Sequence, residues 1–237
     1  MSAAPARRKL GELERPPTAL QAAIPPDLRV RLGMSLPARE GGGEDPPVDL
    51  LVALRRHELG QCDEAPRAGP RPAAEAFAVF FVDGDGRATE VRAATAPADR
   101  TLEACVREVV SGWEFPASRE GMAGPYLARY AYEAATGPAP DYAGPRTLRP
   151  ALRDPSCVER RLAVPAEYRG STGAAVVKLA VDASGAPGLV HALAPVPEPI
   201  LAAVSDAVRG CAWSPGAGED GRPAALWTTL TVRIEGR

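Results

Sequence analysis

The run Phe77-Ala78-Val79-Phe80-Phe81-Val82, followed by Asp83-Gly84-Asp85-Gly86, decides the fold of this 237-residue chain. The first six residues are strong strand formers. The Asp-Gly pairs that follow are typical of a tight hairpin turn, so a second strand is predicted over about residues 88–94. The fold is therefore expected to start from an antiparallel hairpin.

Helices are predicted on both sides of this hairpin. Before it, residues 48–62 place leucines at helical spacing. After it, Asp99 or Thr101 can cap a second helix. The apolar stripe of that helix consists of Leu102, Cys105, Val106, Val109, Val110 and Trp113. Glu114-Phe115-Pro116 ends it, and a third strand is expected over 126–133.

The same plan recurs about a hundred residues later, which points to an internal repeat. Val181-Asp182-Ala183-Ser184-Gly185 repeats the end of the first strand and its turn, and Trp213-Ser214-Pro215 repeats the end of the helix. Each copy reads helix, strand, hairpin, strand, helix, strand. We therefore predict an α+β protein with two tandem modules.

The repeat sets the expected domain boundaries. The modules span residues 47–136 and 150–237, and a linker over 137–149 joins them. Residues 1–46 are rich in proline, glycine and charge, so they cannot bury enough apolar surface to offset their ordering entropy. This stretch is expected to be mostly disordered, with short pieces around 20–24 and 28–36 that can dock on a folded surface.

Together these motifs resemble the TonB C-terminal domain. The shared pattern is a strand ending in V-D-x-x-G, a second strand, an apolar helix ending in W-x-F-P, and a final strand. The first copy is similar to the AgmX/PglI C-terminal variant, because Cys62 and Cys105 stand where that variant has its cysteines. The resemblance implies a three-stranded antiparallel sheet with helices on one face in each module.

The resemblance also implies protein–protein coupling in the cell envelope, often through a partner strand added to a sheet edge. We therefore expect a non-enzymatic adaptor or scaffold of an envelope or motility system that holds a protein partner. The alternatives are a self-assembling structural subunit and a thiol-redox protein. The chain has no N-terminal membrane anchor and its Pro-rich leader is short, so energy transduction is not expected.

The four cysteines fall two to a module, which suggests one disulfide inside each. The pairs would be Cys62 with Cys105 and Cys157 with Cys211. Bridges that close loops of this length are worth about 3–4 kcal/mol in the loop-entropy model. Four buried free thiols in a reducing cytosol are the alternative.

Two surfaces are candidates for partner binding. In the family's usual strand order the third strand lies at the sheet edge, and the outward positions of the second copy there are Trp227, Thr229, Thr231 and Arg233. The second surface is the face of the first strand opposite the helices, with Phe77, Val79 and Phe81. Exposed patches of this size are uncommon on monomers, so burial of this face within the chain is favoured.

Composition and motifs exclude several other functions. A formal charge of −2 without a basic cluster argues against nucleic-acid binding. No apolar run reaches the roughly 18 residues of a membrane span, and no signal peptide is recognised, so the chain as given suggests the cytoplasm, whereas the resemblance suggests the periplasm. Asp83 and Asp85 lack the longer pattern of a calcium loop. We expect no metal, no cofactor and no catalytic site.

Overall fold

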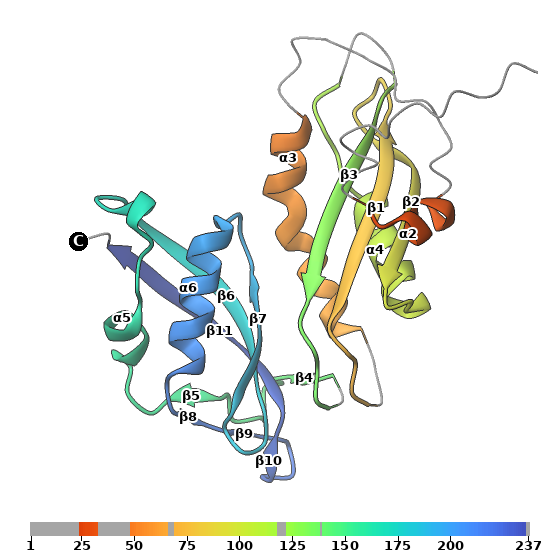
Figure 1. Cartoon of the computed structure of the whole chain (residues 1–237). Helices are drawn as coiled ribbons and strands as arrows, with labels where there is room; N and C mark the ends of the chain where they lie inside the picture. Colours follow the sequence, from red (N-terminus) through yellow and green to blue (C-terminus); the bar gives the residue numbers. More distant parts are fainter. Residues whose placement is uncertain (1–23, 33–47, 66–68, 118–121, 138, 236–237) are drawn as a thin grey trace, which may run out of the picture.

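A computed structural model describes residues 24–32, 48–65, 69–117, 122–137 and 139–235. Within them the chain is α+β with antiparallel sheets, as predicted, and two larger sheets stand side by side (Figure 1). The first sheet has the order β2-β1-β3 and is antiparallel throughout. The second has the order β4-β11-β6-β7, so it contains one strand more than the three expected.

The first sheet and its helices follow the predicted order with small shifts in their bounds. The elements are α2 (Pro26–Arg31), α3 (Val48–Arg55), the 3-10 helix η1 (Arg56–Glu64), β1 (Ala74–Val82), β2 (Ala88–Ala96), α4 (Arg100–Ser111) and β3 (Ala123–Tyr132). The helix expected over 48–62 is thus an α-helix for its first half and a 3-10 helix for its second. Asp99 caps α4, because its side chain accepts hydrogen bonds from the N–H groups of Thr101 and Leu102.

The second half of the chain forms the remaining elements. They are β4 (Asp141–Tyr142), β5 (Ala151–Leu152), α5 (Cys157–Arg161), the 3-10 helix η2 (Ala166–Tyr168), β6 (Thr172–Val181), β7 (Pro187–Ala192), α6 (Glu198–Arg209), β8 (Trp213–Ser214), β9 (Gly216–Ala217), β10 (Pro223–Ala224) and β11 (Leu226–Glu235). The strand β4 lies inside the stretch 137–149 and pairs in parallel with β11. Two residues of the predicted linker therefore belong to the second sheet.

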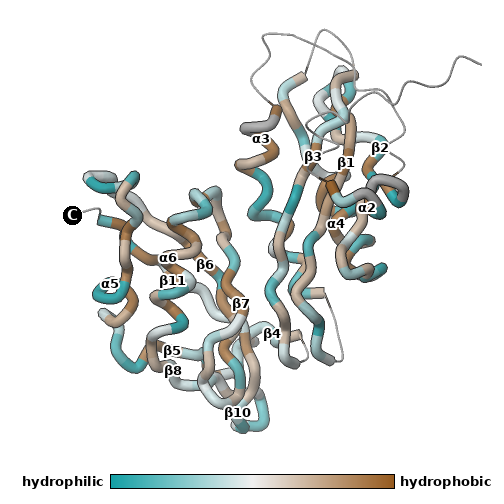
Figure 2. Tube along the Cα trace, viewed as in Figure 1, coloured by the Kyte–Doolittle hydropathy of each residue, from teal (hydrophilic) through white to brown (hydrophobic). Residues whose placement is uncertain are grey.

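Apart from α2, the helices of each half pack against one face of its sheet. The residues of β1 that face α3, η1 and α4 are Ala76, Ala78, Phe80 and Val82, and those of β6 that face α5 and α6 are Ala175, Val177, Leu179 and Val181. The sequence assigned Ala78, Phe80 and Val82, with Val177, Leu179 and Val181 of the second copy, to this face, and they lie there. Hydrophobic residues run along these strands and helices, whereas the turn between β9 and β10 is hydrophilic (Figure 2).

Both hairpins are closed by an aspartate at the end of the central strand. The Oδ1 atom of Asp83 accepts from the N–H of Asp85 at 3.0 Å and of Arg87 at 2.8 Å. Asp182 does the same with Ser184 and Ala186, and the hydrogen bond from the Ser184 hydroxyl further lowers the pKa of its carboxyl. These contacts define the D-x-x-G turn.

The glycine of the first turn meets the end of α4. Gly86 has a φ of +84°, and a Cβ at this position would lie 2.0 Å from the carbonyl oxygen of Phe115. Its own carbonyl accepts from the N–H of Phe115 at 2.7 Å. The Trp-Glu-Phe-Pro segment can therefore pack against the turn only when the turn carries glycine, because any side chain at position 86 would collide with the Phe115 carbonyl.

The tryptophans that end α4 and α6 are buried in the core, as expected. Trp113 meets the ring of Phe80 edge to face with 5.8 Å between the ring centroids. Trp213 donates from its indole N–H to the carbonyl of Val208 at 3.2 Å. Each ring fills the space between a helix and its sheet.

Truncation of either tryptophan is expected to destabilise the protein. Trp113→Ala and Trp213→Ala should each cost roughly 3–5 kcal/mol in urea unfolding, because a large buried side chain leaves a cavity. Leu193 is 47% exposed, and Leu193→Ala is the control, which should change stability by less than about 0.5 kcal/mol. A tryptophan variant that behaves like this control would contradict the core assignment.

Candidate functional site

The outer edge of β11 is open over most of its length. The strand pairs with β6 from Leu226 to Glu235, but β4 pairs only with Leu226 and Trp227 on the other side. In the part of the chain that the structure describes, no other strand pairs with this edge. The sequence predicted the sheet edge at this strand. It did not predict that β4 covers the first two residues of the edge.

The alternation of main-chain groups along β11 identifies which residues this edge presents. The N–H of Asp141 donates to the carbonyl of Ala225 at 3.1 Å, so the groups of Ala225 face β4. Along a strand the main-chain groups of successive residues alternate between the two sides. The pairing of β11 with β6 has no register shift. Thr229, Thr231 and Arg233 therefore present their N–H and C=O groups at the open edge.

The side chains at these positions differ from the predicted set in one respect. Thr229, Thr231 and Arg233 are exposed, as expected of outward positions. Trp227, predicted to be an aromatic anchor for a partner, is only 3% exposed, so that part of the prediction is wrong. Its ring packs with Ala135 of the first half of the chain, and with Ala180 and Leu189.

The second predicted surface is covered. Phe77 is 1% and Val79 is 6% exposed, whereas Phe81 is partly buried. The cover is α2 and its flanking residues, through Ile24, Leu28 and Leu32. The sequence favoured burial of this face within the chain over a partner site. That prediction is confirmed for Phe77 and Val79. Ile24, Leu28 and Leu32 belong to the short apolar pieces for which docking was considered, and they do dock; the rest of 1–46 lies outside the described residues.

Polar contacts fix α2 on this face. The Arg31 guanidinium donates to the carbonyl of Thr95 at 2.9 Å and pairs with Glu103, and Arg92 donates to the carbonyl of Leu32 at 3.2 Å. The apolar contacts and these bonds together hold a helix of only six residues, which would not be stable alone.

Both disulfides are present with the predicted pairing. Cys62 of η1 is bonded to Cys105 of α4, and Cys157 of α5 is bonded to Cys211, which follows α6. Each bond joins a helical segment that precedes the hairpin of its half to the region of the helix that follows the hairpin. The free-thiol alternative does not describe this structure.

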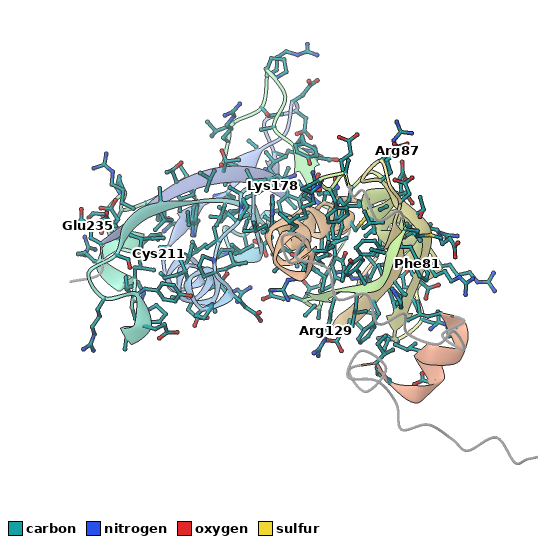
Figure 3. The ribbon with its side chains drawn as sticks, turned by 90° about the horizontal axis from the view of Figure 1, so that it is seen from above. Phe81, Arg87, Arg129, Lys178, Cys211 and Glu235 are labelled. Atoms are coloured by element: carbon teal, nitrogen blue, oxygen red, sulfur yellow. A yellow bond between two sulfur atoms is a disulfide. The ribbon has the colours of Figure 1, made fainter. Side chains whose placement is uncertain are left out.

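A cluster of buried charges lies between the two sheets, and the sequence did not reveal it. Asp63 is fully buried and forms an ion pair with Arg71, and its Oδ2 atom lies 3.2 Å from Nε2 of His191 in β7. Glu64 pairs with Lys178 of β6. Lys178 lies on the side of the second sheet that faces the first (Figure 3). A lone lysine in the apolar strand 172–181 was the signal that could have found it.

Tyrosines complete this cluster. Tyr132 is buried and Tyr130 is partly buried, and desolvation by burial, with a smaller contribution from Asp63, raises the pKa of both phenols well above the usual value. Both therefore remain protonated. Tyr132 donates to the carbonyl of Leu59 at 2.8 Å, and the hydroxyl of Tyr130 lies 3.3 Å from Nδ1 of His191.

A cleft of about 330 Å³ opens beside this cluster. Its walls are α3 and β3 on one side and β7 and α6 on the other, with Leu54, Leu189, Val196 and Leu201 among its apolar residues. Two ion pairs, Arg56 with Glu198 and Arg209 with Glu133, link the walls at the surface. Exposed pairs of this kind contribute little to stability, so the buried cluster carries most of the polar contact between the sheets.

The described residues contain no group of three or more metal-ligand side chains, and no helix among them is long and apolar enough to cross a membrane. Comparison of the chain with protein-family models, curated proteins and solved structures finds no match. A functional assignment therefore has to come from the sequence motifs and the geometry of this chain.

The disulfide pairing leads to a direct test. Digestion of the unreduced protein followed by mass spectrometry should yield peptides that link Cys62 with Cys105 and Cys157 with Cys211. Loss of either bond should lower the free energy of unfolding by about 3–4 kcal/mol, because each closes a long loop. Linked peptides with any other pairing would contradict the arrangement of helices in the affected half.

Proposed function

We propose that this chain is a non-enzymatic scaffold of two tandem modules related to the TonB C-terminal domain, which holds a protein partner by strand addition at the open edge of β11. The observation that carries the proposal is this edge, where Thr229, Thr231 and Arg233 present unpaired main-chain groups beside exposed side chains. An extended peptide can bind such an edge through main-chain hydrogen bonds.

Three local features support the tandem plan. The turn aspartates Asp83 and Asp182 accept equivalent pairs of main-chain hydrogen bonds. Trp113 and Trp213 follow α4 and α6 shortly after their ends, and both are buried. In each half one disulfide ties a helical segment before the hairpin to the region of the helix after it. Such agreement at three separate places is what a duplicated module would retain.

The pairing of β4 supports strand addition at this edge. Asp141 and Tyr142 already pair with the start of β11 through main-chain bonds. A partner segment would continue along the same edge beyond Trp227. Threonines are well suited to such an edge, since they favour the extended conformation and leave the main chain accessible.

The two disulfides favour an oxidising compartment, where such bonds persist. We therefore propose that the chain works in the cell envelope outside the cytoplasm, in agreement with the compartment that the resemblance implies. Redox catalysis is the weaker proposal, because the four cysteines are all bonded and neither pair forms a C-x-x-C motif.

Self-assembly is the second candidate function, and the same edge favours it. Two copies could pair their β11 edges with one another, because an open strand edge accepts any extended chain. The oligomeric state of the purified protein separates the two functions. A monomer that captures another protein supports the adaptor, whereas a stable dimer that dissociates on changes at Thr229 or Thr231 supports the structural subunit.

Proline substitutions at the edge test the binding mode. The partner is first captured with the unchanged protein from its native organism, identified and purified. Thr229→Pro and Thr231→Pro each remove a main-chain N–H from the open edge only, so the fold should persist while affinity for the purified partner falls by about tenfold or more. Affinity is measured by isothermal titration calorimetry and folding by circular dichroism.

Two kinds of control make this test specific. Thr231→Ala keeps the main chain and should bind normally, whereas Thr228→Pro removes an N–H that faces β6 and should lower the melting temperature. Full affinity of both folded edge variants would exclude strand addition at this place.

A further inference from the structure

We infer that the Cys62–Cys105 disulfide is a redox-sensitive latch that keeps the two sheets docked on one another. The bond joins η1 to α4 and includes no residue of β11, so this inference concerns the docking of the sheets and does not depend on partner binding. It rests on the position of η1, which carries one cysteine of the bond and the acidic residues that meet the second sheet.

The acidic groups that face the second sheet follow Cys62 directly in sequence. Asp63 is 0% exposed and contacts both Arg71 and His191. Glu64 pairs with Lys178 and accepts a hydrogen bond from the hydroxyl of Tyr142. A buried charge is tolerated only while its partners are in place, so these contacts depend on the position of η1.

The basic partner on the second sheet is held at the centre of the interface. Lys178 is buried, and its Nζ atom lies 4.2 Å from the ring centroid of Tyr142 and 4.8 Å from that of Trp227. These cation–π contacts join β4 and β11 to the same ammonium group. Displacement of Glu64 would leave this buried cation without its carboxylate, which would favour separation of the sheets.

The disulfide is the covalent tie of η1 to the helix behind it. The segment is a 3-10 helix of nine residues without a side-chain cap at its start, and long 3-10 helices have poor hydrogen-bond geometry. Its other anchors include the buried side chain of Leu59, the bond from Tyr132 to the Leu59 carbonyl and the ion pair of Asp63 with Arg71. The cysteine directly precedes Asp63 and Glu64 in sequence, so the bond restrains the main chain at both residues.

A reductant has a route to the bond. Cys105 is partly buried, and a groove of about 350 Å³ beside the bond is lined by Cys62, Arg71 and Asp99 among others. A dithiol attacks one sulfur as a thiolate and forms a mixed disulfide, and its second thiol then closes on the first. The dithiol is oxidised to a cyclic disulfide, and Cys62 and Cys105 receive the two electrons and two protons as free thiols.

The second disulfide provides a matched control within the same chain. Cys157 and Cys211 lie among residues of α5, α6 and β6. Cys211 lies in the second half of the chain on the side away from the first sheet (Figure 3). Loss of this bond should therefore affect its own half without separating the sheets.

Hydrogen exchange of the full chain, measured by mass spectrometry, tests the latch. In Cys62→Ala/Cys105→Ala, and in the unchanged protein after treatment with dithiothreitol, peptides covering β7 and β4 should exchange faster by on the order of tenfold, while β1 and α4 remain protected. Cys157→Ala/Cys211→Ala should leave β4 unchanged. Equal protection of β4 and β7 with and without the first bond would overturn the inference.

A second variant distinguishes a bond that holds the two sheets together from a bond that stabilises the fold of the first half. Asp63→Asn in the oxidised protein should accelerate exchange in β7 with both disulfides intact, and reduction of this variant should add little, because both changes act on the same contact. Additive effects would overturn the inference. So would loss of protection throughout β1 and α4 on reduction, since the bond would then support the fold of the first half itself.

Discussion

The structure depends on one constraint, which is that each sheet carries buried apolar residues on both faces, whereas the helices of its main core cover only one. In the first sheet the uncovered face carries Phe77 and Val79, and α2 packs on it. In the second sheet the equivalent face carries Ala180 and Trp227, and the first half of the chain packs on it through Ala135. These two covers join the N-terminal helix to the first sheet and the first half of the chain to the second sheet.

The two covers differ in chemistry, and this difference has consequences for function. The cover of the first sheet is mainly aliphatic, whereas that of the second includes buried ion pairs of Asp63 and Glu64. Buried ion pairs need accurate geometry and add little net stability, so such an interface can be released by small local changes. The cover of the second sheet also ends near Trp227, which leaves the edge of β11 open beyond it.

Features encoded in short stretches could be predicted from the sequence. The Asp-Gly turns, the apolar stripes, the buried tryptophans and the cysteine pairing each depend on residues of one repeat. The burial of Trp227 could not be predicted, since its neighbour Ala135 lies about ninety residues away in the sequence. The strand pattern places an aromatic side chain on the outward face, but it does not show whether a partner or the chain itself covers that side chain. The sequence indicated that short apolar pieces near residues 24–32 can dock, but it did not predict the helix there. A helix of six residues is too short to show a helical period of apolar residues. Strand β4 was not predicted for the same reason, since two residues cannot show the alternation of a strand.

The central claim is that β11 offers an open edge to a protein partner, and amide exchange along this strand, followed by nuclear magnetic resonance, tests it most directly. In the free protein the amides of Thr228, Leu230 and Val232, which face β6, should exchange slowly, and those of Thr229, Thr231 and Arg233 should exchange fast. Addition of the captured partner should slow the second set selectively. Uniform protection of β11 in the free protein, or fast exchange at Thr229 and Thr231 in the complex, would contradict the account.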